Sequence, residues 1–146
     1  MRSHGFTLIE LLVALAIMAI ISAVAVPIYT EYSVRTQRTN AEKDLMLCSQ
    51  SMERLASATF TYAGHVGVGD TGVVTPNICI PTTTVYTIAV TVANANTFTI
   101  RATPTVGSLV AGNGLLEVDA SGAQRWDRSQ PSDGDFLDAD ETRWGH

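Results

Sequence analysis

Histidines and basic residues are scarce in this chain of 146 residues, and their scarcity argues against several classes of protein. Only 3 histidines are present, and His4, His65 and His146 lie far apart along the chain, so they predict neither a metal centre nor a catalytic base. Since no nucleophile with a partner base stands out either, we predict that the chain is not an enzyme. Nine basic residues against 14 acidic ones give a net charge of −5, which opposes broad attraction to nucleic acid phosphates.

Cysteine is almost as rare, with 2 residues in the whole sequence, Cys48 and Cys79. They are too few for a zinc site and have no CxxC spacing. In a domain outside the cytoplasm, we expect them to form one disulfide, which would join a loop to a helix. A pair of free buried thiols is the alternative.

Charge is nearly absent from one stretch, Phe6 to Pro27, whose length of about twenty apolar residues suffices for a helix to cross the hydrocarbon core of a membrane. Arg2 and His4 precede it, so the short positive end should stay in the cytoplasm and the rest should lie on the other side. A cleaved signal peptide ending near Ala25, a plain membrane anchor and a buried core helix are alternatives. Neither a signal peptide nor a plain anchor explains Glu10, because a carboxylate within such a span costs about 2.5–3.5 kcal/mol on insertion scales.

The order Gly5-Phe6-Thr7-Leu8-Ile9-Glu10 resembles the cleavage and methylation motif of type IV pilins and type II secretion pseudopilins. The resemblance implies that a prepilin peptidase cuts after Gly5 and that the new N-terminal Phe6 is methylated. It also implies that Glu10 meets the amino terminus of a neighbouring subunit during assembly. On this interpretation residues 1–5 are a leader peptide and residues 6–27 are the transmembrane and filament-core helix.

This resemblance further implies partners and a location. The expected partners are other pilin subunits, bound through their N-terminal helices, the prepilin peptidase, the inner-membrane assembly machinery and, before assembly, membrane lipid. The chain would begin as a single-pass inner-membrane protein with its head, residues 28–146, in the periplasm. It would then become part of an extracellular pilus.

The rest of the sequence predicts an α+β head. Apolar residues at helical spacing from Ala41 to Thr59 indicate that the helix continues past Pro27 to about Ala58. A glycine-rich connecting loop is expected over 60–81, with no regular element. Two β-hairpins follow within 84–127, giving a four-stranded antiparallel sheet packed on the helix in the type IV pilin fold. We expect the helix side near Leu45 and Met52 to be covered by an apolar sheet face, with these candidates: Tyr86, Ile88, Val90, Phe98 and Ile100.

Three features of the head resemble the minor-pilin branch of this family: Ala102-Thr103-Pro104, the strand pattern from Leu116 to Gly122, and Trp144. Unlike many relatives, this chain has no pair of C-terminal cysteines. We therefore predict a minor pilin that supports pilus assembly, twitching motility and adhesion, with a type II secretion pseudopilin or a major pilin as alternatives. A DNA-uptake pilin is not favoured, because the basic residues are scattered: Arg35, Arg38, Lys43, Arg54, Arg101, Arg125, Arg128 and Arg143.

An acidic tail closes the sequence over 128–146. Oxygen ligands at alternate positions around a glycine turn are typical of calcium loops. The candidate ligands are Asp127, Asp133, Asp135, Asp138 and Asp140. Their spacing fits the EF-hand loop poorly, so a solvated acidic tail without any metal or other cofactor is the interpretation that we favour, and calcium is the alternative.

Overall fold

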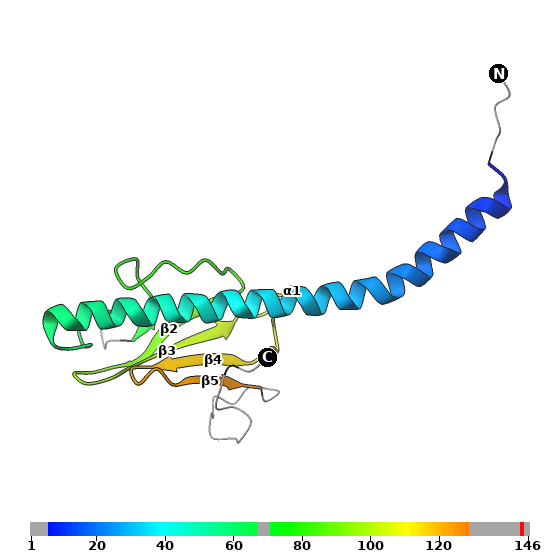
Figure 1. Ribbon diagram of the computed structural model, residues 1–146. Helices are drawn as coiled ribbons and strands as arrows, with labels where there is room; N and C mark the ends of the chain where they lie inside the picture. Colours follow the sequence, from blue (N-terminus) through cyan, green and yellow to red (C-terminus); the bar gives the residue numbers. More distant parts are fainter. Residues whose placement is uncertain (1–5, 67–70, 129–143, 145–146) are drawn as a thin grey trace. The chain divides into compact units, whose positions relative to one another are not determined.

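The N-terminal helix α1 (Leu8–Thr59) is the longest element of the computed structural model, which describes residues 6–66, 71–128 and 144 (Figure 1). Its end confirms the prediction of a helix that runs to about Ala58. Pro27 lies inside α1 and does not end it, because proline removes one backbone donor but keeps a φ that a helix accepts. The chain divides into two compact units, Met1–Arg35 and Thr36–His146.

In the first unit, the described residues form an apolar helical segment with exposed side chains. An 18-residue window of α1 has a mean hydropathy of 2.8 and no buried residue. By length and composition this segment can cross a membrane. Large side chains such as Leu8 and Ile9 are 78% and 66% exposed, respectively, so the segment has apolar surface to offer to lipid or to other helices.

The second unit contains an antiparallel sheet of five strands in sequential order (Figure 1). The strands are β1 (Gly72–Val73), β2 (Tyr86–Ala93), β3 (Phe98–Pro104), β4 (Leu115–Asp119) and β5 (Gln124–Asp127). Both predicted hairpins are confirmed, as β2 with β3 and β4 with β5. A register shift between Val90 and Val92 marks a bulge in β2.

The prediction of four strands was wrong by one, because β1 lies in the segment that we expected to be a loop. Gly72 pairs with Val90, and Val73 pairs with Ala89, at the free edge of β2. No sequence pattern predicts this strand, since two residues cannot show the alternation by which strands are detected. Gly72 also has a φ of 131°, which other residues rarely adopt, so the glycine that seemed to forbid a strand permits this one.

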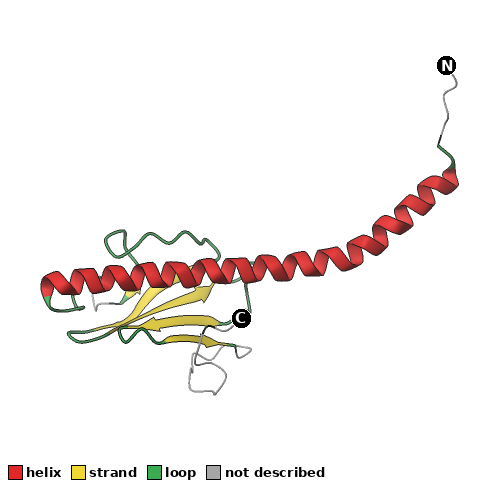
Figure 2. Cartoon of the chain, viewed as in Figure 1, coloured by secondary structure: helices red, strands yellow, loops and turns green. Residues whose placement is uncertain are grey.

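The core lies between the sheet and the part of α1 in the second unit, which runs along one sheet face (Figure 2). Leu45, Cys48 and Met52 on α1 are completely buried. The predicted apolar sheet face is confirmed, because all five of its candidates are at least 97% buried: Tyr86, Ile88, Val90, Phe98 and Ile100. Each such side chain contributes about 1.5–3 kcal/mol relative to exposure.

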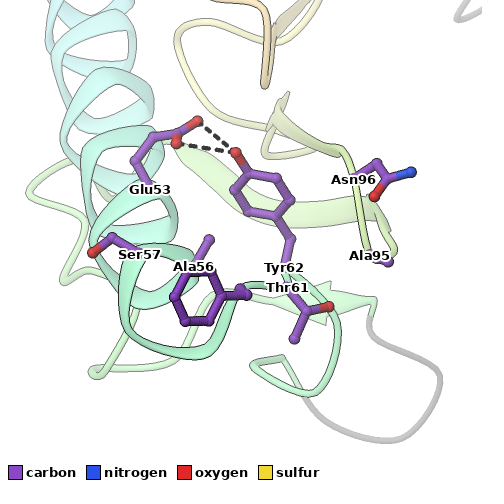
Figure 3. A pocket seen from close by; sticks show the side chains of 8 residues that line it. Glu53, Ala56, Ser57, Thr61, Tyr62, Ala95 and Asn96 are labelled. Atoms are coloured by element: carbon purple, nitrogen blue, oxygen red, sulfur yellow. Dashed lines mark hydrogen bonds between the residues drawn. The ribbon is translucent and has the colours of Figure 1, made fainter.

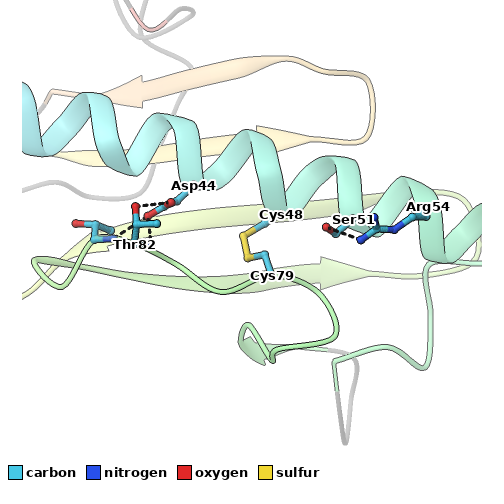
Figure 4. Close-up of a disulfide and its surroundings, with 7 residues drawn as sticks. Asp44, Cys48, Ser51, Arg54, Cys79 and Thr82 are labelled. Carbon is cyan, nitrogen blue, oxygen red and sulfur yellow. Dashed lines mark hydrogen bonds between the residues drawn. A yellow bond between two sulfur atoms is a disulfide. The ribbon is translucent and has the colours of Figure 1, made fainter.

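The predicted disulfide between Cys48 and Cys79 is confirmed, and it joins α1 to the chain ahead of β2 (Figure 4). The two Cα atoms are 5.0 Å apart, and the described residues contain no free cysteine. The alternative of two free thiols is therefore wrong. The bond closes a loop with a sequence separation of 31 residues, which includes the glycine-rich segment.

Asp44 supplies a second link between α1 and the same part of the chain (Figure 4). Its carboxylate accepts hydrogen bonds from the Thr82 amide at 2.8 Å, the Thr82 hydroxyl at 2.9 Å and the Thr83 amide at 2.9 Å. Charged residues of a helix usually face solvent, but Asp44 is only 2% exposed. Its partners lie 38 and 39 residues away, so no local pattern could have predicted this burial.

Candidate functional site

The start of α1 carries the two described residues of the predicted processing and assembly site, Phe6 and Glu10. Glu10 accepts hydrogen bonds from the Thr7 amide at 3.0 Å and the Thr7 hydroxyl at 2.9 Å. The Glu10 amide in turn donates to the Thr7 hydroxyl at 3.3 Å. This reciprocal arrangement is a capping box, which satisfies backbone donors at the start of a helix. Gly5, the predicted cleavage position, lies outside the described residues.

The capping box holds the Glu10 carboxylate at the N-terminal end of the helix. Orphan N–H groups and the positive end of the helix dipole favour a negative charge there. Phe6 precedes the cap and is 89% exposed. Sequence reasoning missed the role of Thr7, although its position three residues before a glutamate is the usual signal of a capping box. Within the described part of the single chain, the side chain of Glu10 is therefore hydrogen-bonded to Thr7 alone, at the N-terminal edge of an otherwise apolar segment.

Paired charges cross three strands of the sheet. Arg101 on β3 donates to Glu117 on β4 at 2.9 and 3.2 Å. From β5, Arg125 bridges Glu117 at 3.2 Å and Asp119 at 2.8 Å. The strand register brings these side chains together, because Glu117 lies directly opposite Arg101 on β3 and Arg125 on β5. Two positive and two negative charges cancel, so this ladder adds little attraction for an anionic ligand.

Asp119 also organises the turn between β4 and β5. Burial raises the pKa of its carboxyl, but hydrogen bonds from Ser121, Ala123 and Arg125 outweigh it, so that the pKa lies below its ordinary value. The Arg125 and Ala123 contacts measure 2.8 and 3.1 Å. Asp119 is therefore ionised at neutral pH and contributes to the turn in that form.

Trp126 on β5 has two arginines near its ring. The guanidinium of Arg38, from α1, lies 3.9 Å from the ring centre, and that of Arg128 lies 4.1 Å from it. The Trp126 indole donates to the Asn113 carbonyl at 2.8 Å. Arg38 additionally forms an ion pair with Glu42 at 3.6 Å. These contacts engage two of the predicted basic residues in the packing of the head.

The described residues show little of the machinery that a catalytic or metal site needs. His65 makes contacts of 3.2 Å with the Thr59 hydroxyl and the Thr61 carbonyl, which place it in the turn after α1. No group of three potential metal ligands occurs in this part of the chain. Of the calcium candidates only Asp127 is described, as a fully buried residue of β5; Asp133, Asp135, Asp138 and Asp140 lie outside. The calcium loop therefore stays a prediction.

Comparison with known proteins identifies the family. Residues 27–113 match the family described as type IV minor pilin ComP, DNA uptake sequence receptor. The chain belongs to this family of type IV minor pilins. Residues 1–26 match the prokaryotic N-terminal methylation motif. The chain is thus a structural subunit of the type IV pilin family, and its N-terminal motif and apolar helix fit a membrane-anchored pilin of an extracellular pilus.

Individual relatives match over shorter stretches. A fimbrial protein of Pseudomonas aeruginosa is 43% identical over 49 residues, which are 34% of this chain and 32% of the relative. The type IV major pilin protein PilA of Myxococcus xanthus is 39% identical over 44 residues, 30% and 20% of the two chains. For the major pilin PilE1 of Neisseria gonorrhoeae the identity is 51% over 37 residues, 25% and 22%. The matches thus span about a third or less of these relatives, and no solved structure matches the chain.

Proposed function

We propose that this pilin is a minor subunit of a type IV pilus, cut after Gly5, methylated at Phe6 and assembled through the N-terminal part of α1, with its head on the periplasmic side before assembly. The observation that carries the proposal is an exposed apolar helical segment that begins with a carboxylate. Phe6 directly precedes the helix cap and lies four residues before Glu10 in the sequence. Pilus assembly, twitching motility and adhesion are the roles that we assign to the filament.

On this proposal the Glu10 carboxylate has two successive surroundings, the bilayer and the filament. In the bilayer the carboxylate costs about 2.5–3.5 kcal/mol on insertion scales, and the capping box with Thr7 offsets part of that cost. In a filament the positively charged amino terminus of an adjacent Phe6 would neutralise it. Removing one member of such a buried pair typically costs about 3–5 kcal/mol, because the other charge is left without a partner.

The test is a Glu10→Ala variant in a strain that lacks the native copy. We expect normal or slightly increased membrane content and a severe loss from sheared filaments. Glu31→Ala is the matched control, because Glu31 also lies on α1 and is 77% exposed, but its ion pair is the local one with Arg35. Wild-type incorporation of Glu10→Ala would contradict the proposal.

The abundance of the subunit separates the remaining structural alternatives. A minor pilin should be a trace component of sheared filaments, whereas a major pilin would be the dominant band. If the chain were a secretion pseudopilin, its deletion would block protein secretion and leave pili intact. We expect a trace band, together with reduced piliation and twitching after deletion.

A second candidate function, DNA binding, is favoured by one observation, the match of residues 27–113 to a family described as a DNA uptake sequence receptor. Three basic residues in the described part of the second unit are exposed: Lys43, Arg54 and Arg128. The pairing of Arg101 and Arg125 with acids weakens this candidate. A receptor should bind duplex DNA with an affinity that falls steeply with salt, and the combined Lys43→Gln, Arg54→Gln and Arg128→Gln variant should flatten that slope. Absence of binding at low salt would exclude the candidate.

A further inference from the structure

Phe60, directly after α1, occupies an unfavourable position. Its φ is 59°, in the left-handed region, and Phe60 is the only described residue other than glycine with a positive φ. The Phe60 amide donates to the Ala56 carbonyl at 2.7 Å, which is the hydrogen bond of a left-handed helix cap. Glycine or asparagine normally fills this position, because a larger L-residue is strained there by about 1–2 kcal/mol.

The Phe60 ring gains nothing from packing in return, because it is 91% exposed. Backbone strain and solvent exposure of a large aromatic side chain are both unfavourable, and asparagine would avoid both. Strain of this kind is found at functional sites more often than elsewhere. The position therefore points to a use of the ring outside the folding of the head.

A hollow of about 400 Å³ lies beside Phe60, where three segments meet: the last turns of α1, residues 60–62, and the turn between β2 and β3. Figure 3 shows Glu53 and Ser57 on α1, with Asn96 on the opposite side. The Tyr62 hydroxyl donates to both carboxylate oxygens of Glu53, at 3.1 and 3.0 Å. An edge-to-face contact with Phe98, with ring centres 5.0 Å apart, holds the Tyr62 ring in place. This side of the hollow is thus preorganised.

The chemistry of the lining is that of a site for polyhydroxylated, uncharged ligands. Glu53 has lone pairs left to accept hydroxyl groups, and the Asn96 amide offers both donors and an acceptor. Phe60 supplies an apolar surface on which the C–H face of a sugar ring can lie. Of the described residues that line the hollow, Glu53 is the only charged one, and its negative charge opposes phosphate, sulfate and carboxylate groups.

We propose that this hollow binds a neutral hexopyranose, with Phe60 stacked on the sugar ring and with Glu53 and Asn96 bonded to its hydroxyl groups. Nucleotides fit less well, because their phosphates would meet Glu53. The hollow lies in the second unit and shares no residue with the N-terminal segment used for assembly. Sugar binding and filament assembly are therefore separable by mutation.

The experiment uses the full chain in a detergent without a sugar headgroup, such as lauryldimethylamine oxide. Saturation-transfer NMR is recorded with the methyl glycosides of β-glucose, β-galactose and β-N-acetylglucosamine, and with thymidine 5′-monophosphate. We expect at least one glycoside to bind with a dissociation constant on the order of 1 mM, typical of weak single-ring ligands. The nucleotide should give no signal.

Phe60→Asn is the decisive variant, because asparagine accepts the left-handed conformation. We expect an unchanged or higher melting temperature and at least a tenfold loss of sugar affinity. Val106→Ala is the matched control, since Val106 is a 97% exposed apolar residue elsewhere in the head, and its loss should not change binding. Glu53→Gln should also weaken sugar binding. If Phe60→Asn fails to fold, the sugar affinity of Glu53→Gln tests the proposed site instead.

Three results would overturn the proposal. The first is no glycoside signal from the wild type at tens of millimolar. The second is equal sugar affinity in Phe60→Asn, and the third is preferred binding of the nucleotide. Incorporation of Phe60→Asn into filaments is measured in parallel. Normal incorporation with lost sugar binding would support the site and leave the assembly proposal untouched.

Discussion

Three carboxylates of this pilin show how the surroundings of a residue decide its role. Asp44 is buried and bonded to two backbone amides and a hydroxyl, so it fixes a distant segment on α1. Glu117, between two arginines, joins neighbouring strands. Glu10 is bonded only to Thr7, within its own helical turn. Of the three, Glu10 is the one whose described contacts are all local, which is why we assign it to contact with another subunit.

The lowered pKa of Asp119 makes a prediction about acid stability. Because the folded pKa lies below the unfolded value, the carboxylate stabilises the fold above about pH 4, and this contribution is lost as the pH falls through the folded pKa. Asp119→Asn should cost about 1–2 kcal/mol at neutral pH. Denaturant titrations at about pH 6 and pH 3 should show the variant approaching the wild type in acid. If the wild type and Asp119→Asn differed equally in free energy of unfolding at both pH values, the role assigned to the Asp119 carboxylate would be contradicted.

Gly114 tests how closely the backbone packs near β5. Its φ is 84°, and an added Cβ atom would lie 2.9 Å from the Asp127 carbonyl carbon and even closer to its oxygen. Gly114→Ala should therefore lower the free energy of unfolding by about 3 kcal/mol or more. Gly107→Ala is the matched control, since Gly107 has a similar φ of 77° but open space around it. It should cost about 1 kcal/mol, and equal losses would show that contact with Asp127 is unimportant.

At the scale of elements, the sequence predicted the helix and the strands that have a periodic apolar pattern, and it missed the elements that have none. The periodicity from Ala41 onward predicted the second half of α1, and β-branched alternation predicted β2 and β3 with their buried face. Strand β1, by contrast, exists only because the edge of β2 binds a two-residue segment. The hollow beside Phe60 was missed for a similar reason, since its lining comes from three segments that meet only after folding.

The link between α1 and the glycine-rich segment should depend on the disulfide. In the chain-entropy model a loop of this size contributes about 3–4 kcal/mol. We expect the Cys48→Ala, Cys79→Ala double variant to lose about that much free energy of unfolding, with a similar loss for the reduced wild type. Quantitative thiol labelling of the unreduced protein should detect no free cysteine. Labelling of both residues would refute the bond.

The two units of the molecule differ in whether their apolar side chains are buried or exposed. The described part of the second unit buries an apolar core between α1 and the sheet, although single apolar side chains such as Phe60 and Val106 are exposed. In the first unit, side chains of the same kind are exposed over an 18-residue window. Such a segment is stable in lipid or against other helices, and its use for assembly requires that processing leaves it intact.

The proposed cleavage after Gly5 would meet this requirement. A cut there removes Arg2 and His4, keeps the whole apolar segment and creates an amino terminus at Phe6, four residues before Glu10. Mass spectrometry of the filament form should therefore find N-methylphenylalanine at Phe6. Gly5→Ala should be processed at least in part, whereas Gly5→Leu should accumulate as precursor, because a bulky side chain blocks approach of a protease to the backbone. Normal processing of Gly5→Leu would refute the steric argument, and a mature chain that begins at Val26 would instead identify the apolar segment as a signal peptide.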